Sequence, residues 1–327
     1  MGYFLGVDVG ATKTHALLAD DAGQALGFSR AGPGNHQVVG YQGLSESIQT
    51  AVGEALAMAG LDVSQISGAG FGIGGYDWPS QLQDHLGAIS PLGLPCTPEV
   101  VNDSIIALLA GAPEGWGIVL IAGTGSNCRG RDQSGREARI TGEGERFGEF
   151  GGAGDVVDRA FHAVSHEWTR RGPETALTRI FIDLTGAEDL EDLIEGIDLN
   201  RYHLEAAWAP KVFQAAHGGD KAAHQVIDWA GRQLGESACG VIRHLAIQGL
   251  RFDIVLAGSL FDGGELFIDP LKAAILNFAP HAHFIRLTVP PVVGAVALAM
   301  RSARLDPRFI RERLIESTRE MLKTIAA

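Results

Sequence analysis

The stretch GVDVGATKTHALLADDAGQAL, residues 6–26, decides the fold class. An apolar run enters a turn that contains a glycine, a lysine and two threonines, and a second apolar run leaves it. A polar turn at residues 20–23 then leads into a third run. This pattern predicts short strands over residues 3–9, 14–20 and 24–30, arranged as an antiparallel meander. Glycine, lysine and hydroxyl groups gathered in one turn are typical of an anion site.

The turn is not a P-loop. A P-loop would need glycine at positions 7 and 12, where the chain has Val7 and Thr12, and a helix after the lysine. We therefore expect a β-turn to hold a phosphate, with Asp8 next to it holding a hydrated Mg²⁺ through water, because a bare carboxylate would repel the phosphate. Taken alone, the turn is equally compatible with an ordinary hairpin. The expected phosphate contacts are Gly10, Ala11, Thr12, Lys13 and Thr14.

Composition limits the class of protein. The chain has 327 residues, which favours two domains, and its 46% hydrophobic content is that of a globular α/β protein. Its net charge of −13 argues against partners such as nucleic acid or an anionic membrane surface. Three cysteines without a CxxC pattern indicate reduced thiols. We see no signal peptide and no apolar run long enough to span a membrane, so we expect a cytoplasmic protein.

The strand–turn–strand unit occurs twice. A buried strand at 117–123 enters the turn AGTGSN (122–127), and a third glycine turn follows the strand in DIVLAGSLFDGG (253–264). Further strands are expected at 66–75 and 98–101, and helices at 40–59, 103–111, 155–172 and 220–248. We predict two related α/β domains, residues 1–115 and 116–305. A closing helix at about 306–327, with Asp306 as N-cap and Pro307 at its first position, should return to the first domain.

Five motifs occur in an order that resembles one superfamily. They are DVGATKT (8–14), VVNDSIIALLAG (100–111), IVLIAGTGSNCRG (118–130), VLAGSL (255–260) and PPVVGAVALA (290–299). Together they resemble the sugar kinase, Hsp70 and actin superfamily. With GTGSNCR (123–129) and GNH (34–36), they are most similar to the N-acetylglucosamine kinase branch of the BadF/BadG/BcrA/BcrD ATPase-like family. The resemblance implies two actin-like (ribonuclease H-like) ATPase domains with nucleotide and sugar in the cleft between them, the cofactors ATP and Mg²⁺, and a homodimer.

The resemblance also assigns site residues. It implies that Asp103 is the catalytic base, although Asn-Asp-Ser before a helix is also what a simple N-cap looks like. The second phosphate turn would be Gly123, Thr124, Gly125 and Ser126. Gly258 and Ser259 would bind adenosine. The implied sugar contacts are Asn35, Asp103, Asn127 and Glu149, and the substrate pocket could also include Gly75, Asp77 and Glu143.

The segment TGEGERFGEFGG (141–152) departs from the family pattern. In a gapless register Glu149 replaces the sugar-binding Asp, Phe150 replaces a Glu and Gly152 replaces a Ser. Glu143 stands where the family has an aromatic residue, and Gln37 replaces the aromatic residue after the Asn-His pair. One hypothesis is that Glu143 favours the protonated amine of glucosamine over N-acetylglucosamine. The alternative is that Glu143 is simply solvated.

The sequence gives less support to three alternatives: a dinucleotide site, an activator ATPase and a non-catalytic sensor. GFGIGG (70–75) matches the dinucleotide pattern GxGxxG but lacks the helix and the later acidic residue that such a site needs. Activator ATPases of the same family place a cluster-ligating Cys just before the second phosphate turn, where residues 119–122 hold none. A non-catalytic sugar or nucleotide sensor remains open because of residues 149–152. We expect an ATP-dependent kinase of an amino sugar, N-acetylglucosamine or glucosamine.

Overall fold

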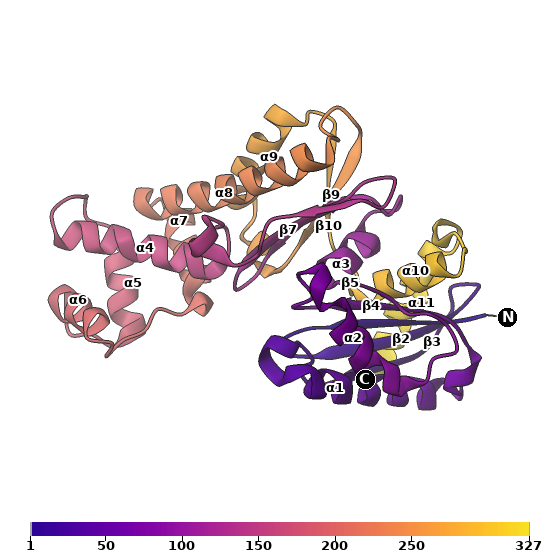
Figure 1. Cartoon of the computed structure of the whole chain (residues 1–327). Coiled ribbons are helices and arrows are strands. Elements are labelled where there is room, and N and C mark those ends of the chain that lie inside the picture. Colours follow the sequence, from indigo (N-terminus) through magenta and orange to yellow (C-terminus); the bar gives the residue numbers. More distant parts are fainter. Residues whose placement is uncertain (1, 327) are drawn as a thin grey trace.

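The computed structural model describes residues 2–326 and contains two lobes, each built on a five-stranded sheet (Figure 1). The strands are β1 (Tyr3–Val9), β2 (Thr14–Asp20), β3 (Ala25–Ala31), β4 (Ile66–Ile73), β5 (Glu99–Asn102), β6 (Gly117–Ala122), β7 (Ser126–Arg131), β8 (Glu137–Arg139), β9 (Phe252–Ala257) and β10 (Ala282–Arg286). The helices are α1 (His36–Ala59), α2 (Leu82–Ile89), α3 (Asp103–Gly111), α4 (Ala153–Trp168), α5 (Ala176–Thr185), α6 (Leu190–Asp198), α7 (Ala209–His217), α8 (Lys221–Leu245), α9 (Glu265–Phe278), α10 (Val292–Ser302) and α11 (Arg311–Ala326). We call the lobe of β1–β5 the first lobe and the lobe of β6–β10 the second lobe.

The two sheets have the same topology. The strand order is β3-β2-β1-β4-β5 in the first lobe and β10-β9-β6-β7-β8 in the second. In each, a central strand pairs antiparallel with the next strand in sequence and parallel with a later one. This repeat confirms the predicted α/β fold of two related halves, and the three strands predicted in the opening meander are present.

Local chemistry explains where α1 begins and ends. The side chain of Asn35 accepts a hydrogen bond from the backbone N–H of Gln37, which makes Asn35 the N-cap. The predicted helix began at residue 40 because the apolar spacing starts there. The structure adds a first turn from His36 that is interrupted at Gly40, whose φ of 69° is non-helical. Gly60, in the left-handed conformation, ends the helix.

Helix α10 belongs to the first lobe, which differs from the predicted second domain of residues 116–305. Its small residues lie directly on the first sheet, where glycines allow a close approach. A Cβ at Gly6 would lie 2.5 Å from the backbone nitrogen of Val296, and one at Gly68 would lie 2.6 Å from the carbonyl of Ala299. The chain therefore crosses between lobes twice, before β6 and again before α10. Sequence order alone could not show that the second crossing precedes α10.

Helix α11 packs beside β3. The buried hydroxyl of Ser317 accepts a hydrogen bond from the backbone N–H of Ala25 and donates one to the carbonyl of Gly23. Leu314 is buried in the same cluster as Phe4 and Phe28. Asp306 caps the short 3₁₀ turn Pro307–Phe309 that precedes α11, rather than α11 itself. These contacts hold α11 against the start of β3.

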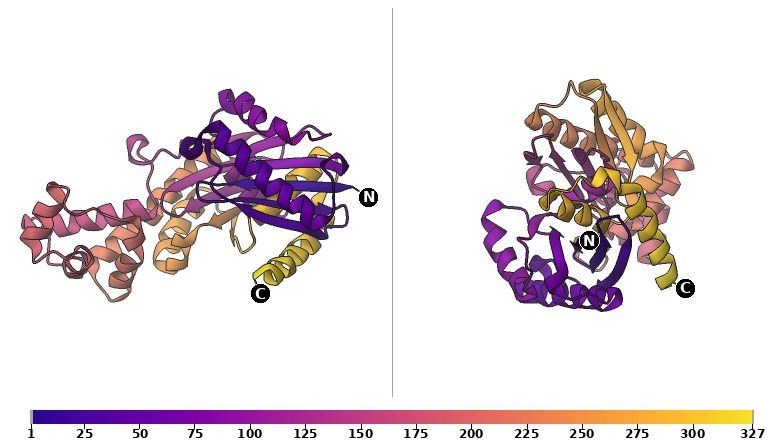
Figure 2. Two further views of the ribbon diagram at one scale, coloured as in Figure 1. Left: turned by 90° about the horizontal axis from the view of Figure 1, so that it is seen from below. Right: turned by 90° about the vertical axis from the view of Figure 1, so that its right-hand side faces the viewer.

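Helix α3 lies between the two sheets. One side places Ile105, Ile106 and Leu109 against α10, and the other places Leu108 in a cluster with Val255 of β9. On the far side of the second sheet, α4–α7 extend away from the rest of the molecule (Figures 1 and 2). Their apolar faces share one core with α8 and α9. No helix among residues 2–326 has the length and apolar character needed to cross a membrane. All three cysteines are free thiols.

Candidate active site

Three strand ends meet at one edge of the first sheet. In the parallel register Val9 lies opposite Ile73, and Ile73 lies opposite Asn102. The residues that flank or follow these positions are therefore neighbours, although they come from three distant segments. Gly74 shows how close they are: its N–H donates to the carbonyl of Val9, and a Cβ on it would lie 3.1 Å from a carboxylate oxygen of Asp103. A side chain at position 74 would push against the carboxylate.

Two carboxylates share this edge. Burial raises the pKa of Asp103 to about 6, against the opposing effect of the nearby Arg129 guanidinium. Burial also raises the pKa of Asp8 to about 7; the charge of Asp103 adds to the rise, and Lys13 opposes it. A carboxyl group with a raised pKa at the first position of a helix is suited to proton transfer. Asp103 therefore has the chemistry expected of a general base.

The first phosphate turn is closed by its own backbone. The N–H of Gly10 donates to the carbonyl of Lys13, and the carbonyl of Gly10 accepts from Gly34 and Asn35. Residues 11–13 between them are exposed and free to contact a ligand. Thr14 was predicted to contact a phosphate, but its side chain is fully buried. Its hydroxyl lies close to the backbone of Gly34. As the first residue of β2, Thr14 points into the fold, so it cannot offer its hydroxyl to a phosphate in this conformation.

The predicted sugar residues Asn35 and Gly75 are in contact. A Cβ at Gly75 would lie 2.5 Å from the side-chain oxygen of Asn35, and the φ of Gly75 is +86°. Next to them the rings of His36 and Tyr41 stack, and the ring of His85 meets both edge-on, with centroids 4.6–5.3 Å apart. This packing fixes the Asn35 cap against the end of β4. The loop that follows β4 is thereby held beside Asp103.

Asp77, on that loop, forms an ion pair across the two lobes. Its carboxylate lies 2.7 Å from Nη2 of Arg129 in β7, and both side chains are largely buried. Asn102 also contacts Asp77, at 3.4 Å. Arg139 of β8 lies over the ring of Trp78, 4.2 Å from its centroid. These residues line a crevice of about 200 Å³ between the lobes, bounded on one side by Asn102, the residue before Asp103.

The second phosphate turn lies at the corresponding strand ends of the second sheet. The N–H of Gly123 donates to the carbonyl of Gly125, and Thr124 and Gly125 are exposed. The start of α4 closes over this turn: Ala153 N–H donates to Gly123 and Gly154 N–H donates to Thr124. Ser126, the last residue of the predicted phosphate set, begins β7 and is partly buried.

The predicted adenosine residues sit beside this turn. Ile121 of β6 pairs with Ala257 of β9, so Gly258 follows at the same edge. Gly258 has a φ of +109°, and a Cβ there would clash with the carbonyl of Ala122. Only glycine permits this close approach of the two strand ends. Ser259 is exposed next to it.

Glu149 has a different environment from the one expected. Its carboxylate is buried and accepts hydrogen bonds from the backbone N–H groups of Thr141, Gly142 and Glu143, at 2.6–3.2 Å, and from the Thr141 hydroxyl. We expected these oxygens to receive sugar hydroxyls. Instead they hold the turn at residues 141–143, next to Asn127, whose amide nitrogen would lie 3.1 Å from a Cβ on Gly142. The Asn127 side-chain oxygen accepts from the N–H of Cys128.

Two other positions that depart from the family pattern are Phe150 and Glu143. Phe150 packs on Trp229 of α8, with ring centroids 5.4 Å apart. The side chain of Glu143 is exposed.

The site can accommodate a magnesium ion. Asp8 and Asp103 are two carboxylates close enough to raise the pKa of Asp8, beside a turn suited to phosphate. A hydrated divalent cation between Asp8 and a phosphate would offset this repulsion, and Mg²⁺ is usually held by one or two carboxylates, phosphates and water. Among residues 2–326 no cluster of three or more metal-ligating side chains occurs.

Comparison with known proteins places the chain in a family. The model of the BadF/BadG/BcrA/BcrD ATPase family matches residues 5–299. The chain belongs to this family. It is 28% identical over 302 residues to N-acetylmuramic acid/N-acetylglucosamine kinase of Clostridium acetobutylicum, covering 91% of this chain and 98% of that protein. It is 25% identical to N-acetyl-D-glucosamine kinase of Dictyostelium discoideum, covering 92% and 98% of the two chains.

A solved structure supports the fold of this family member. A Chromobacterium violaceum protein that carries a provisional N-acetylglucosamine kinase name superposes with a TM-score of 0.64 at 23% identity. The superposition covers 91% of this chain and 99% of that protein. The recognised family and the two-lobed kinase-like fold are therefore confirmed.

One site residue of this BadF/BadG/BcrA/BcrD family member was not singled out from the sequence. Arg129 was quoted only as the end of GTGSNCR, yet it is the charged group of the second lobe that reaches Asp77 and Asp103. Arg129 is the fourth residue of β7 and lies between buried Cys128 and Gly130. A charged residue within such a strand is the feature that could have marked it as a site residue. An arginine in a buried stretch of strand needs a partner, but the sequence could not say which one.

Proposed function

We propose that this chain is an ATP- and Mg²⁺-dependent kinase that transfers the γ-phosphate of ATP to a hydroxyl of an amino sugar. The observation that carries the proposal is the position of Asp103, at the helix start beside the interlobe crevice, with its pKa raised to about 6. The family match and the names of the curated relatives support the same reaction.

In this mechanism Asp103 removes the proton from the sugar hydroxyl. The sugar oxygen forms a bond to the γ-phosphorus, the bond from that phosphorus to the β–γ bridging oxygen breaks, and ADP leaves. Lys13 and the backbone N–H groups of the exposed residues 11–12 and 124–125 orient the phosphates. Asp8 would hold Mg²⁺ through water, and the ion would supply neutralising charge. Closure of the two lobes excludes water and so limits ATP hydrolysis.

The sugar is proposed to lie between Asn35, Gly75, Asp77 and Asn127, next to Asp103. Glu149 acts indirectly, because its carboxylate holds the 141–143 turn against Asn127. N-acetylglucosamine is the first candidate substrate and N-acetylmuramic acid the second, since the curated relatives act on them. Glucosamine is the third, from the charge of Glu143.

The test is ADP release with MgATP and a panel of N-acetylglucosamine, N-acetylmuramic acid, glucosamine, N-acetylmannosamine, glucose and no sugar. Strong stimulation by one sugar establishes the kinase and its substrate. ADP release that ignores every sugar would overturn the kinase proposal in favour of a plain ATPase. Weak binding of sugar without any turnover would favour a sensor. A clear preference for N-acetylglucosamine over glucosamine would reject the role of Glu143.

A homodimer is also part of the proposal, because the family resemblance implies one. Light scattering of the purified protein tests it: a mass near twice 34.6 kDa is expected. A mass of one chain at all concentrations would reject it.

A further inference from the structure

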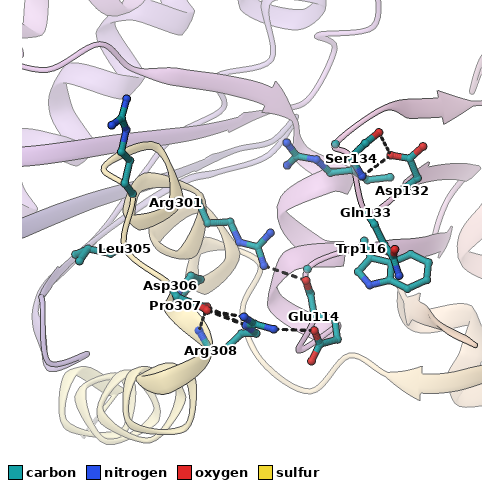
Figure 3. Close-up of a pocket in the computed structure, with 14 residues that line it drawn as sticks. Glu114, Trp116, Asp132, Gln133, Ser134, Arg301, Leu305, Asp306, Pro307 and Arg308 are labelled. Atoms are coloured by element: carbon teal, nitrogen blue, oxygen red, sulfur yellow. Dashed lines mark hydrogen bonds and ion pairs between the residues drawn. The ribbon is translucent and has the colours of Figure 1, made fainter.

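A second and larger pocket lies at the connection between the lobes. It has a volume of about 600 Å³. Its walls come from the first crossing of the chain (residues 114–116), the β7–β8 turn of the second lobe (131–135), and the end of α10 with the segment that follows it (301–308). We call it the hinge pocket. Figure 3 shows Arg301 and Arg308 on one side and Trp116 on the other, with Glu114 between them.

The charges of the hinge pocket do not cancel. Arg131, Arg301, Arg304 and Arg308 line it, along with three acidic residues. Each of the three acidic residues already forms an ion pair with an arginine. Glu114 and Asp306 both pair with Arg308, at 3.0 and 2.6 Å. Asp132 accepts from the Ser134 hydroxyl and pairs with Arg136, which lies outside the pocket. Among residues 2–326 no ion pair is formed by Arg301 or Arg304, and Arg131 has only a 3.9 Å contact with Glu99.

Two guanidinium groups have buried donors without partners. Within the hinge pocket, as residues 2–326 describe it, these are Nη1 of Arg131 and Nε of Arg301, two atoms with almost no accessible surface, so a ligand in the pocket would meet other nitrogens of these groups. The Arg301 guanidinium lies on the backbone of Gly115, where any Cβ would overlap it, and it donates to the carbonyl of Glu114 at 3.1 Å. Burial, and secondly the charge of Arg131, lower the pKa of Arg301. Arg131 and Arg301 are therefore two partly buried cations close enough to repel each other at the wall of one pocket, an arrangement that an anion in the pocket would stabilise.

The size and shape of the hinge pocket suit a small phosphorylated molecule. A planar guanidinium group can donate two hydrogen bonds to one phosphate, and Arg131, Arg301 and Arg304 all line the pocket. The volume exceeds what one phosphate fills, and the ring of Trp116 offers a face for the rest of the molecule. We propose that the hinge pocket binds a phosphate monoester or inorganic phosphate, held between Arg131 of the second lobe and Arg301 and Arg304 of the first. The proposal is independent of the kinase reaction.

Calorimetric titration of the full chain tests the site. Inorganic phosphate and N-acetylglucosamine 6-phosphate are titrated separately in the presence of saturating Mg²⁺ and a non-hydrolysable ATP analogue, which occupy the phosphate turns of the cleft. Binding of either probe is expected. A tighter Kd for the sugar phosphate identifies a monoester site, and equal affinities identify a site for inorganic phosphate. The absence of binding by both probes would overturn the proposal.

Matched variants locate the binding. Arg131→Gln and Arg304→Gln should each weaken binding about tenfold, because each removes a charge-assisted contact. Arg304 is exposed, so its variant tests the site even where the loss of Arg131 disturbs folding. Arg179→Gln is the control: Arg179 is an exposed arginine on α5 that pairs only with Asp183. Unchanged affinity in both hinge variants, or an equal loss in the control, would contradict the assignment.

Discussion

At the scale of single residues, Asp103 combines the geometry and the acidity of a base. Because it is the acidic residue in the first turn of α3, the helix N-terminus favours its ionised form, while burial opposes it. Asp103→Asn keeps the shape but cannot accept a proton. We expect turnover to fall by about 10²–10⁴-fold, with a Tm at neutral pH that is no lower, because Asn removes a buried charge whose pKa the fold raises. Asp84→Asn, in the first turn of α2, is the matched control and should keep full activity.

The acidity of Asp103 sets the pH dependence. Burial raises its pKa from 3.8 to about 6, and the base works only when ionised. The value of kcat/KM for the sugar should therefore fall as pH drops through about 6, by about tenfold per unit below it. A pH–rate profile in a series of buffers of equal ionic strength measures this. Activity that stays constant down to pH about 4.5 would show that Asp103 is not the base.

The Asp77–Arg129 pair is a second residue-scale prediction. Both side chains are largely buried, so Asp77→Asn removes the ion-pair partner of a buried guanidinium between the lobes. Breaking a buried pair in this way costs about 3 kcal/mol of the free energy of unfolding, measured by urea denaturation. Asp183→Asn breaks an exposed pair with Arg179 and should cost less than about 1 kcal/mol. Equal losses of unfolding free energy in the two variants would mean that the interlobe pair stabilises the protein no more than an exposed pair does.

At the scale of elements, the site depends on the contact between the end of strand β4 and the start of helix α1. The turn after β4 contacts the cap of α1 through Gly75, whose positive φ and lack of a side chain are both required. Gly75→Ala should strain the backbone and displace the Asn35 amide, so KM for the sugar rises and stability falls by about 1 kcal/mol or more.

A glycine within α1 provides the control for that change. Gly53 is exposed, and a Cβ there meets nothing within 4 Å. Gly53→Ala should raise stability by about 0.5–1 kcal/mol without changing KM, because alanine is the better helix former. The two variants are compared by thermal unfolding and by sugar-dependent kinetics. If Gly75→Ala leaves KM unchanged, Asn35 does not contact the sugar.

At the scale of the whole molecule, the two ends of the chain stabilise the first lobe together. Ser317 of α11 is buried and bonded to Gly23 and Ala25 across nearly the full length of the sequence. Ser317→Ala leaves both backbone groups unpaired and should cost about 1–3 kcal/mol, with no change in KM. Ser302→Ala, at an exposed hydroxyl, is the control and should be close to neutral. Chemical denaturation of both variants measures the difference.

The sequence by itself determined much of the fold and part of the site. The strands of the meander, the glycine turns and the helix that begins at Asp103 follow from local periodicity and from the conformational freedom of glycine, which act over a few residues. The placement of Asp8 and Asp103 near one edge also follows once the parallel register of β1, β4 and β5 is assumed. Repetition of the strand–turn–strand unit was enough to indicate two related halves.

Other features were decided only by the tertiary structure. Helix α10 packs on the first sheet, Glu149 turns to the backbone of 141–143, Thr14 is buried, and Arg129 reaches Asp77. Each of these depends on packing between segments far apart in the chain, where many arrangements share the same local pattern. The hinge pocket is the clearest case, because its arginines come from segments about 170 residues apart and acquire a common environment only when both lobes are folded.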